Sequence, residues 1–118
     1  MRNYFLKKEV KSSNIRDIFI NGIGDNLIKY SRVHVFISGK VQGVYYRQNT
    51  AYKAEELNIH GWVRNLRDGC VEAVFEGEKT NIDKLLDWCN KGPKDAIVEN
   101  VKIIDEQYQN EYTDFRII

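Results

Sequence analysis

The stretch "VHVFISGKVQGVYYRQNTAYKAEEL", residues 33–57, contains the signals of a strand, a glycine loop and a helix in succession. Apolar residues at Val33, Val35 and Ile37 alternate with the residues between them, and this period of two predicts a β-strand. Residues 47–57 lack Gly and Pro and carry Thr50, Ala51, Ala54 and Leu57 along one helical stripe. The loop between the two therefore lies where a strand leads into a helix, a junction that often binds anions.

Two further strands and a second helix follow. Residues 59–66 and 70–78 predict strands, and Asp68-Gly69 between them is a strong hairpin signal. Asn58 suits the end of the preceding helix because Asn tolerates a positive φ. Residues 80–93 predict a helix whose buried positions recur with helical spacing: Ile82, Leu85, Leu86 and Cys89. We expect Thr80 or Asn81 to cap its start and Gly92-Pro93 to end it.

The chain closes with a strand over residues 96–107 and a short one over residues 114–118. The order βαββαβ, with right-handed crossovers that place both helices on one face, predicts a ferredoxin-like α+β sandwich. In this fold the sheet is expected to be antiparallel, and the third strand runs between the first two. No internal repeat or low-complexity segment is found.

Composition places the chain among ordinary globular proteins. It has 118 residues, of which 42% are hydrophobic and 30% charged, and its net charge is +1. This balance gives no support for nucleic acid or anionic membranes as partners. No apolar run approaches the roughly 18 residues of a membrane span, so a cytoplasmic location is expected. Cys70 and Cys89 lack metal-ligand spacing and are interpreted as reduced, half-buried thiols.

Residues 1–30 differ from the rest. They carry an excess of three positive charges, whereas residues 31–118 carry an excess of two negative charges. We therefore divide the chain into an N-terminal extension, residues 1–30, and a domain, residues 31–118. Within the extension, apolar residues from Ile15 to Leu27 have nearly helical spacing that Gly22 and Gly24 interrupt. A broken amphipathic helix and a loosely ordered arm both fit this pattern. Whether the extension covers the site or mediates self-association is open.

The glycine loop is a candidate phosphate site. Gly39 and Gly43 can adopt φ values closed to other residues, which lets the main chain wrap an anion. Arg47, at the start of the helix, can hold two phosphate oxygens with its planar fork. An ordinary tight turn with a surface arginine is the alternative.

A second polar residue is expected beside this loop. The first two strands of a split βαβ unit are parallel, so their carboxyl ends emerge together. The second strand ends near Asn65, whose carboxamide can bind a water in line with a bound phosphorus. The alternative is an Asn that serves the Asp68-Gly69 turn.

The motifs "GKVQGVYYR" and "GWVRNLRDGCVE" together resemble the two signatures of the acylphosphatase family. The resemblance extends from about Arg32 to Ile118. It implies that Arg47 binds phosphate and that Asn65 positions the nucleophilic water. It also implies a phosphate cradle made by the backbone of Lys40, Val41, Gln42, Gly43, Val44, Tyr45 and Tyr46. By the same resemblance the protein hydrolyses small-molecule acyl phosphates with no metal and no cofactor, and Tyr45 and Tyr46 depart from the residues most common in the family.

The residues agree with this chemistry. The two motif cores contain no obvious general base, and a carboxylate leaving group departs without protonation. His34 and His60 are interpreted as strand surface or boundary residues. The main alternative is a phosphate-binding regulatory module without catalysis. RNA binding is disfavoured by the negative charge of residues 31–118 and by the lack of an RNP-like run. We expect a monomer with no nucleic-acid or membrane partner.

Overall fold

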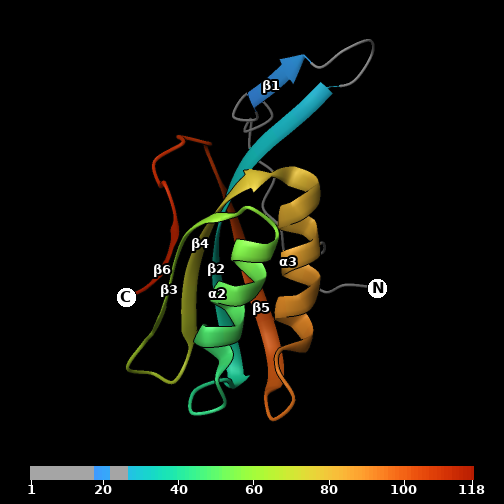
Figure 1. Cartoon of the computed structure of the whole chain (residues 1–118). Helices are drawn as coiled ribbons and strands as arrows, with labels where there is room; N and C mark the ends of the chain where they lie inside the picture. Colours follow the sequence, from blue (N-terminus) through green and yellow to red (C-terminus); the bar gives the residue numbers. More distant parts are fainter. Residues whose placement is uncertain (1–17, 22–26) are drawn as a thin grey trace.

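The computed structural model describes residues 18–21 and 27–118. Their elements, in chain order, are β1 Ile18–Asn21, β2 Leu27–Lys40, α2 Tyr46–Glu56, β3 His60–Asn65, β4 Val71–Glu78, α3 Lys79–Lys91, β5 Ile97–Glu106 and β6 Phe115–Ile117 (Figure 1). From β2 to β5 the order is βαββαβ, and β6 is the short last strand. The predicted ferredoxin-like fold is confirmed.

The sheet is built around β2. β4 pairs antiparallel with one edge of β2 and also with β3, so it lies between them, whereas β5 pairs antiparallel with β2 on the other side. β6 pairs in parallel with β3, so the prediction of an antiparallel sheet is wrong at this edge. The reason is that residues 107–114 return the chain to the end of the sheet where β3 starts. β6 then runs in the same direction as β3.

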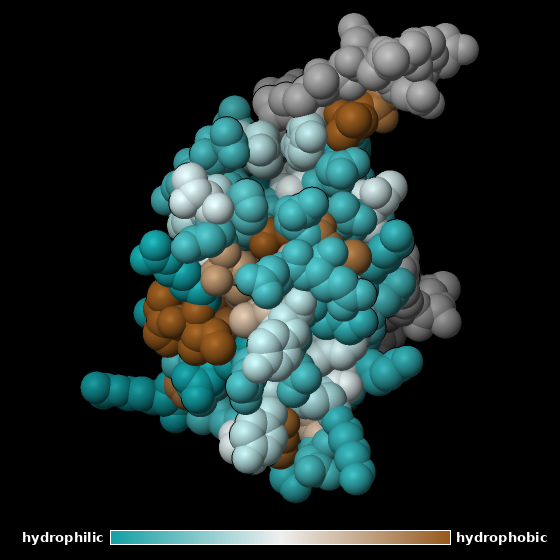
Figure 2. Space-filling model, viewed as in Figure 1, coloured by the Kyte–Doolittle hydropathy of each residue, from teal (hydrophilic) through white to brown (hydrophobic). Residues whose placement is uncertain are grey.

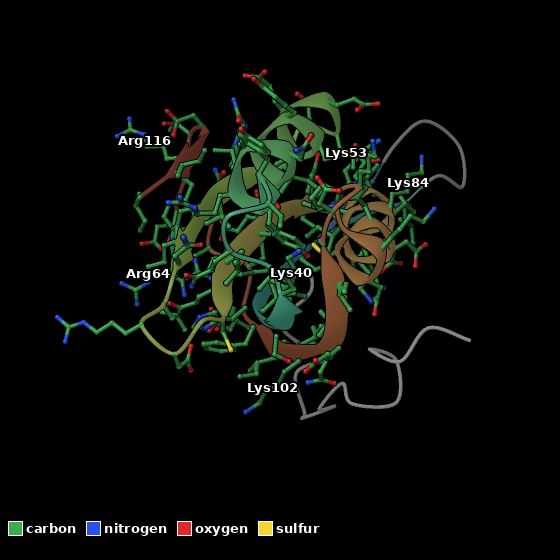
Figure 3. The ribbon with its side chains drawn as sticks, turned by 90° about the horizontal axis from the view of Figure 1, so that it is seen from below. Lys40, Lys53, Arg64, Lys84, Lys102 and Arg116 are labelled. Atoms are coloured by element: carbon green, nitrogen blue, oxygen red, sulfur yellow. The ribbon has the colours of Figure 1, made fainter. Side chains whose placement is uncertain are left out.

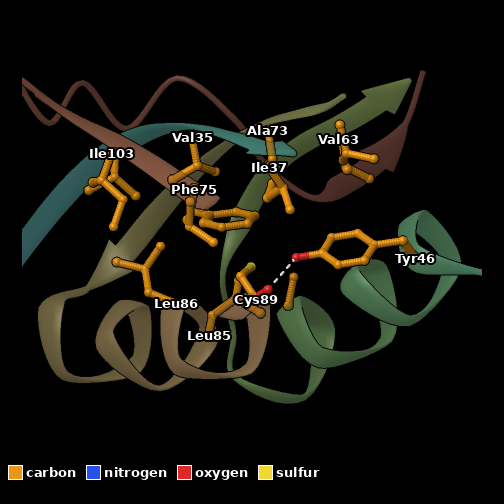
Figure 4. Close-up of a cluster of buried hydrophobic side chains, with 14 of the residues drawn as sticks. Val35, Ile37, Tyr46, Val63, Ala73, Phe75, Leu85, Leu86, Cys89 and Ile103 are labelled. Carbon is orange, nitrogen blue, oxygen red and sulfur yellow. Dashed lines mark hydrogen bonds between the residues drawn. The ribbon is translucent and has the colours of Figure 1, made fainter. Parts of the chain in front are cut away.

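Both helices cover one face of the sheet, and the hydrophobic core lies between these two layers (Figure 1). The predicted alternation is confirmed, because Val33, Val35 and Ile37 are buried. The predicted stripe of α3 is buried as well, and Figure 4 shows Leu85, Leu86 and Cys89 of this stripe beneath the sheet residues. Hydrophilic residues cover most of the face shown in Figure 2, and hydrophobic colour is confined to separate patches. No helix of the described segments is long and apolar enough to cross a membrane.

Tyr46 ties the first helix to the second across this core. Its ring is 1% exposed, and its hydroxyl donates to the backbone carbonyl of Cys89 at 2.7 Å (Figure 4). Cys89 lies in the last turns of α3, and the residue four positions later is Pro93, which has no N–H to offer. The tyrosine hydroxyl therefore supplies the hydrogen bond that the helix cannot. Burial raises the pKa of Tyr46 well above its ordinary value, so the hydroxyl keeps its proton.

The predicted helix ends are partly right. Asn58 has a φ of 56° just after α2, and Gly92 has a φ of 70° just after α3, as expected. The expected cap at Thr80 or Asn81 is wrong, because β4 ends at Glu78 and α3 begins at Lys79 with no loop between them. Both residues therefore already lie inside the first turn of the helix, and no side chain caps its start.

The helix interpretation of the N-terminal segment is wrong where the structure describes it. Ile18–Asn21 forms β1, and its residues pair with residues 27–30 of β2 as an antiparallel hairpin. β2 thus begins at Leu27, before the predicted domain boundary. The remainder of the N-terminal extension before β2, residues 1–17 and 22–26, lies outside the described residues.

A buried carboxylate organises the sheet face opposite the helices. Glu76, 3% exposed, accepts hydrogen bonds from the backbone N–H groups of Gln109 and Glu111 at 3.0 and 2.9 Å. It also pairs with Arg32, which in addition contacts Glu106 and Glu111. Burial opposes the charge of Arg32, but these carboxylates raise its pKa above the ordinary value. Glu76 thereby fixes the segment that leads from β5 to β6.

His34 and Glu72 lie on the same face. His34 Nε2 lies 2.7 Å from Glu72 Oε2, and Arg64 donates to the other carboxylate oxygen at 2.6 Å. Burial opposes the charge of Glu72, but these two partners lower its pKa below the ordinary 4.5. His60 contacts the backbone carbonyl of Tyr112 at 3.1 Å. Both histidines are partly buried residues of the sheet, in agreement with their interpretation from sequence.

Candidate active site

The loop between β2 and α2 offers a row of backbone donors. Residues 41–45 belong to neither element, and in the described chain none of their N–H groups donates to another backbone group. Val41 and Val44 are buried and anchor the loop, while Gly43 between them has a φ of 76°. Backbone N–H groups held in place at the start of a helix are suited to an anion.

Gly39 serves a different purpose from the one expected. It has a φ of 123° but lies inside β2, at a register shift against β5. A Cβ atom there would come within 2.2 Å of the backbone oxygen of Ile97. Glycine is required because β5 approaches closely, and Gly43 alone of the two lies in the loop.

A cavity of about 480 Å³ opens beside this loop. It is lined by Val41, Gln42, Gly43, Tyr45, Tyr46, Arg47, Gln48, Asn65 and Ile117. Two members of the expected cradle lie outside this lining. Lys40 is exposed at the end of β2, where it pairs with Ile97 (Figure 3), and Val44 is buried in the core. The fold therefore brings Arg47 and Asn65, from two separate motifs, to one cavity.

Arg47 is the second residue of α2 and is partly exposed. It forms no ion pair or hydrogen bond with any residue that the structure describes. The cavity lining contains no Asp, Glu or His among the described residues, so no carboxylate competes for the guanidinium. The basic side chains that Figure 3 labels, such as Lys53, Lys84 and Lys102, point in different directions around the molecule. Arg47 gives the cavity its positive charge.

Asn65 is the last residue of β3. Its Oδ1 atom is buried and has no hydrogen-bond partner among the described residues. The hairpin turn is held by other groups, because Cys70 N–H donates to Asp68 Oδ1 at 2.9 Å and Leu66 N–H donates to the Cys70 carbonyl at 2.8 Å. Asn65 thus does not serve the turn. An unpaired buried amide oxygen costs about 1–3 kcal/mol, and such groups concentrate at functional sites.

Gln42 connects the two halves of the site. Its side-chain Nε2 donates to the carbonyls of Leu66 and Cys70, at 2.7 and 2.9 Å. The loop of residues 41–45 is therefore fastened to the hairpin that follows Asn65. The sequence shows the motif that contains Gln42. No local pattern indicates that its side chain contacts residues 24 and 28 positions further along the chain. Sequence reasoning also missed Gln48 and Ile117 in the lining, the latter because the parallel pairing of β6 was not foreseen.

The chain was compared with known proteins. The family model for acylphosphatase matches residues 33–117. The chain belongs to the acylphosphatase family. It is 51% identical over 87 residues to the acylphosphatase of Syntrophus aciditrophicus, which covers 74% of this chain and 91% of that relative. Identity to the acylphosphatase of Marinobacter nauticus is also 51%, over 86 residues, with 73% and 94% covered.

The fold comparison agrees. The structure of an acylphosphatase from Coxiella burnetii matches with a TM-score of 0.72 and 44% identity, and the match covers 75% of this chain and 93% of that one. The acylphosphatase part begins within β2 and includes every residue of the cavity lining. Family and fold together support acylphosphatase activity, the hydrolysis of an acyl phosphate to a carboxylate and phosphate.

Proposed function

We propose that the cavity beside residues 41–45 carries out the acylphosphatase reaction of this chain. The observation that supports this is the meeting of three groups in one cavity: unpaired loop N–H groups, the guanidinium of Arg47 and the carboxamide of Asn65. The first two suit a phosphate dianion, and the third suits a water molecule. A site for binding alone would need only the first two.

In this mechanism the phosphoryl group lies against the loop. The N–H groups and Arg47 hold its oxygens, and these contacts strengthen as the phosphoryl group passes through the transition state. Arg47 is suited to this because its fork can bond two oxygens at once. Gln42 keeps the loop in register with β3 through its two hydrogen bonds.

Asn65 positions the attacking water. The water oxygen bonds to phosphorus while the bond from phosphorus to the acyl oxygen breaks, and the electron pair of that bond leaves on the carboxylate. The proton of the water passes to a phosphate oxygen. A carboxylate needs no acid to leave, which fits a cavity whose described lining has no acidic or histidine side chain.

We also propose that the reaction requires no metal ion. Among the described residues no three His, Cys, Asp or Glu side chains gather so as to hold a metal ion. We expect acetyl phosphate to be hydrolysed in EDTA, with little action on p-nitrophenyl phosphate, whose leaving group is poorer. Activity that is lost on exhaustive chelation and restored by Mg²⁺ would contradict the mechanism.

The roles of the two residues are separable by experiment. Arg47→Gln should weaken inhibition by inorganic phosphate and also lower kcat by about two orders of magnitude or more. Asn65→Ala should leave the phosphate inhibition constant unchanged and mainly lower kcat. Inhibition constants are measured beside kcat for each variant, with circular dichroism to verify the fold. Wild-type kcat in Asn65→Ala would refute its role with the water.

We also propose that residues 31–118 form a catalytic domain that works as a cytoplasmic monomer without nucleic-acid or membrane partners. All residues of the cavity lining belong to this range. A chain that starts at Leu27, where β2 begins, should keep its sheet and most of its kcat. Loss of activity with the sheet intact would place residues 1–26 in the site. Sedimentation of the full chain tests the monomer.

A further inference from the structure

The site contains an aromatic residue that the mechanism does not use. Tyr45 is 74% exposed, although both of its neighbours, Val44 and Tyr46, are buried. Its backbone is left-handed, with φ 65° and ψ 26°. This conformation costs a residue other than glycine about 1 kcal/mol or more. Core packing does not offset that cost, because the side chain faces solvent.

Tyr45 stands between two hollows. The first is the cavity that contains Arg47 and Asn65, and the second has a volume of about 410 Å³. The second hollow is lined by Val44, Tyr45, Gln48, Asn49, Tyr52, Pro93, Lys94 and Asp95. Only Tyr45 and Gln48 belong to both linings. The second lining includes no residue of β3 or β6.

The direction of the reaction places the acyl group on this side. Water and leaving group lie roughly in line on opposite sides of the phosphorus. In the proposed mechanism the water is held by Asn65, at the end of β3. The acyl group therefore points away from β3, toward Tyr45 and the second hollow.

We propose that Tyr45 is the wall of an acyl-group subsite, which favours acyl phosphates with a flat aromatic acyl group over acetyl phosphate. This rests on the proposed function and adds a substrate preference to it. An aromatic acyl group can stack on the exposed ring, whereas an acetyl group is too small to cover it. Such stacking contributes about 0.5–1.5 kcal/mol, which corresponds to a factor of about 2–12 in kcat/KM.

The test is the ratio of kcat/KM for benzoyl phosphate to kcat/KM for acetyl phosphate. Tyr45→Asn removes the ring but tolerates the left-handed backbone, and it should lower this ratio about fivefold. Tyr45→Phe keeps the ring and should keep the wild-type ratio. Tyr108→Asn is the matched control, since Tyr108 is a partly exposed tyrosine between β5 and β6 that belongs to neither lining. It should leave the ratio unchanged.

An unchanged ratio in Tyr45→Asn would overturn the subsite, even if both rates fell. So would a fall of equal size in Tyr108→Asn, because the effect would then not be specific to the position beside the cavity. If the proposed function itself were wrong, the wild-type protein would hydrolyse neither benzoyl phosphate nor acetyl phosphate.

Discussion

Replacement of Tyr46 by Phe tests the link between the two helices. The change removes one hydroxyl and leaves the buried carbonyl of Cys89 without a partner, since Pro93 has no N–H to replace it. Tyr46 and Cys89 are 1% and 0% exposed, so water cannot substitute without a rearrangement. A buried acceptor that loses its only partner costs about 1–3 kcal/mol. For a chain of this length that lowers Tm by about 5–15 °C.

The measurement is urea and thermal unfolding followed by circular dichroism. Tyr45→Phe is the matched control, because it removes the same atom from the neighbouring residue, which is exposed, and should change stability by less than about 0.5 kcal/mol. A conservative substitution is therefore expected to be costly at this position. If Tyr46→Phe is as stable as Tyr45→Phe, the hydrogen bond to Cys89 does not matter and the reasoning is wrong.

Four other outcomes are expected. Glu76→Gln should lower the free energy of unfolding by about 1–3 kcal/mol in urea titrations, because a buried arginine loses one of its three carboxylate partners and two backbone donors lose a charged acceptor; a loss below about 0.5 kcal/mol would contradict this role. The pKa of Glu72 is lowered in the folded state, so its carboxylate stabilises the fold above pH 4.5, and this contribution fades as pH falls through the folded pKa. The stability gap between wild type and Glu72→Gln should therefore narrow below pH 4.5, and a constant gap would be inconsistent with the shift. Burial raises the pKa of the Cys89 thiol to about 12, so a thiol reagent at pH 8 should modify only Cys70 in the native protein and both thiols in urea. Asn65→Ala should not lower stability and should raise it by up to about 1 kcal/mol, because it removes an unpaired buried oxygen; a clear loss would show that Oδ1 has a structural partner.

The sequence was informative where local pattern decides structure. The alternation at Val33, Val35 and Ile37 and the spacing of the α3 stripe reflect burial on one face, and both were confirmed. The two motifs also predicted that Arg47 and Asn65 lie close together, because parallel strands bring their carboxyl ends together. Both residues line one cavity in the structure.

Features that depend on contacts between distant residues were not predictable. β6 is parallel to β3 because residues 107–114 return the chain to the end of the sheet where β3 starts. Glu76 bonds to Gln109 and Glu111 in this segment, and no local pattern reveals that contact. Gly39 is required by the approach of β5, which is far away in sequence. The strand at Ile18–Asn21 was not among the two interpretations of the extension, a broken helix or a loosely ordered arm, because the apolar residues there have nearly helical spacing.

The central position of β2 has a consequence for how fast the chain folds. Its residues pair with β5 across long stretches of chain, for example Arg32 with Glu106 and Ile37 with Val101. Pairings of this kind require the closure of large loops before they contribute energy, and they are typical of domains that fold in milliseconds to seconds. The loop of residues 41–45 follows β2 directly, so its backbone N–H groups take their final places only once these distant strands have joined. Inorganic phosphate should accordingly slow unfolding while it leaves the folding rate nearly unchanged, because the ligand recognises a surface that the transition state has not yet assembled.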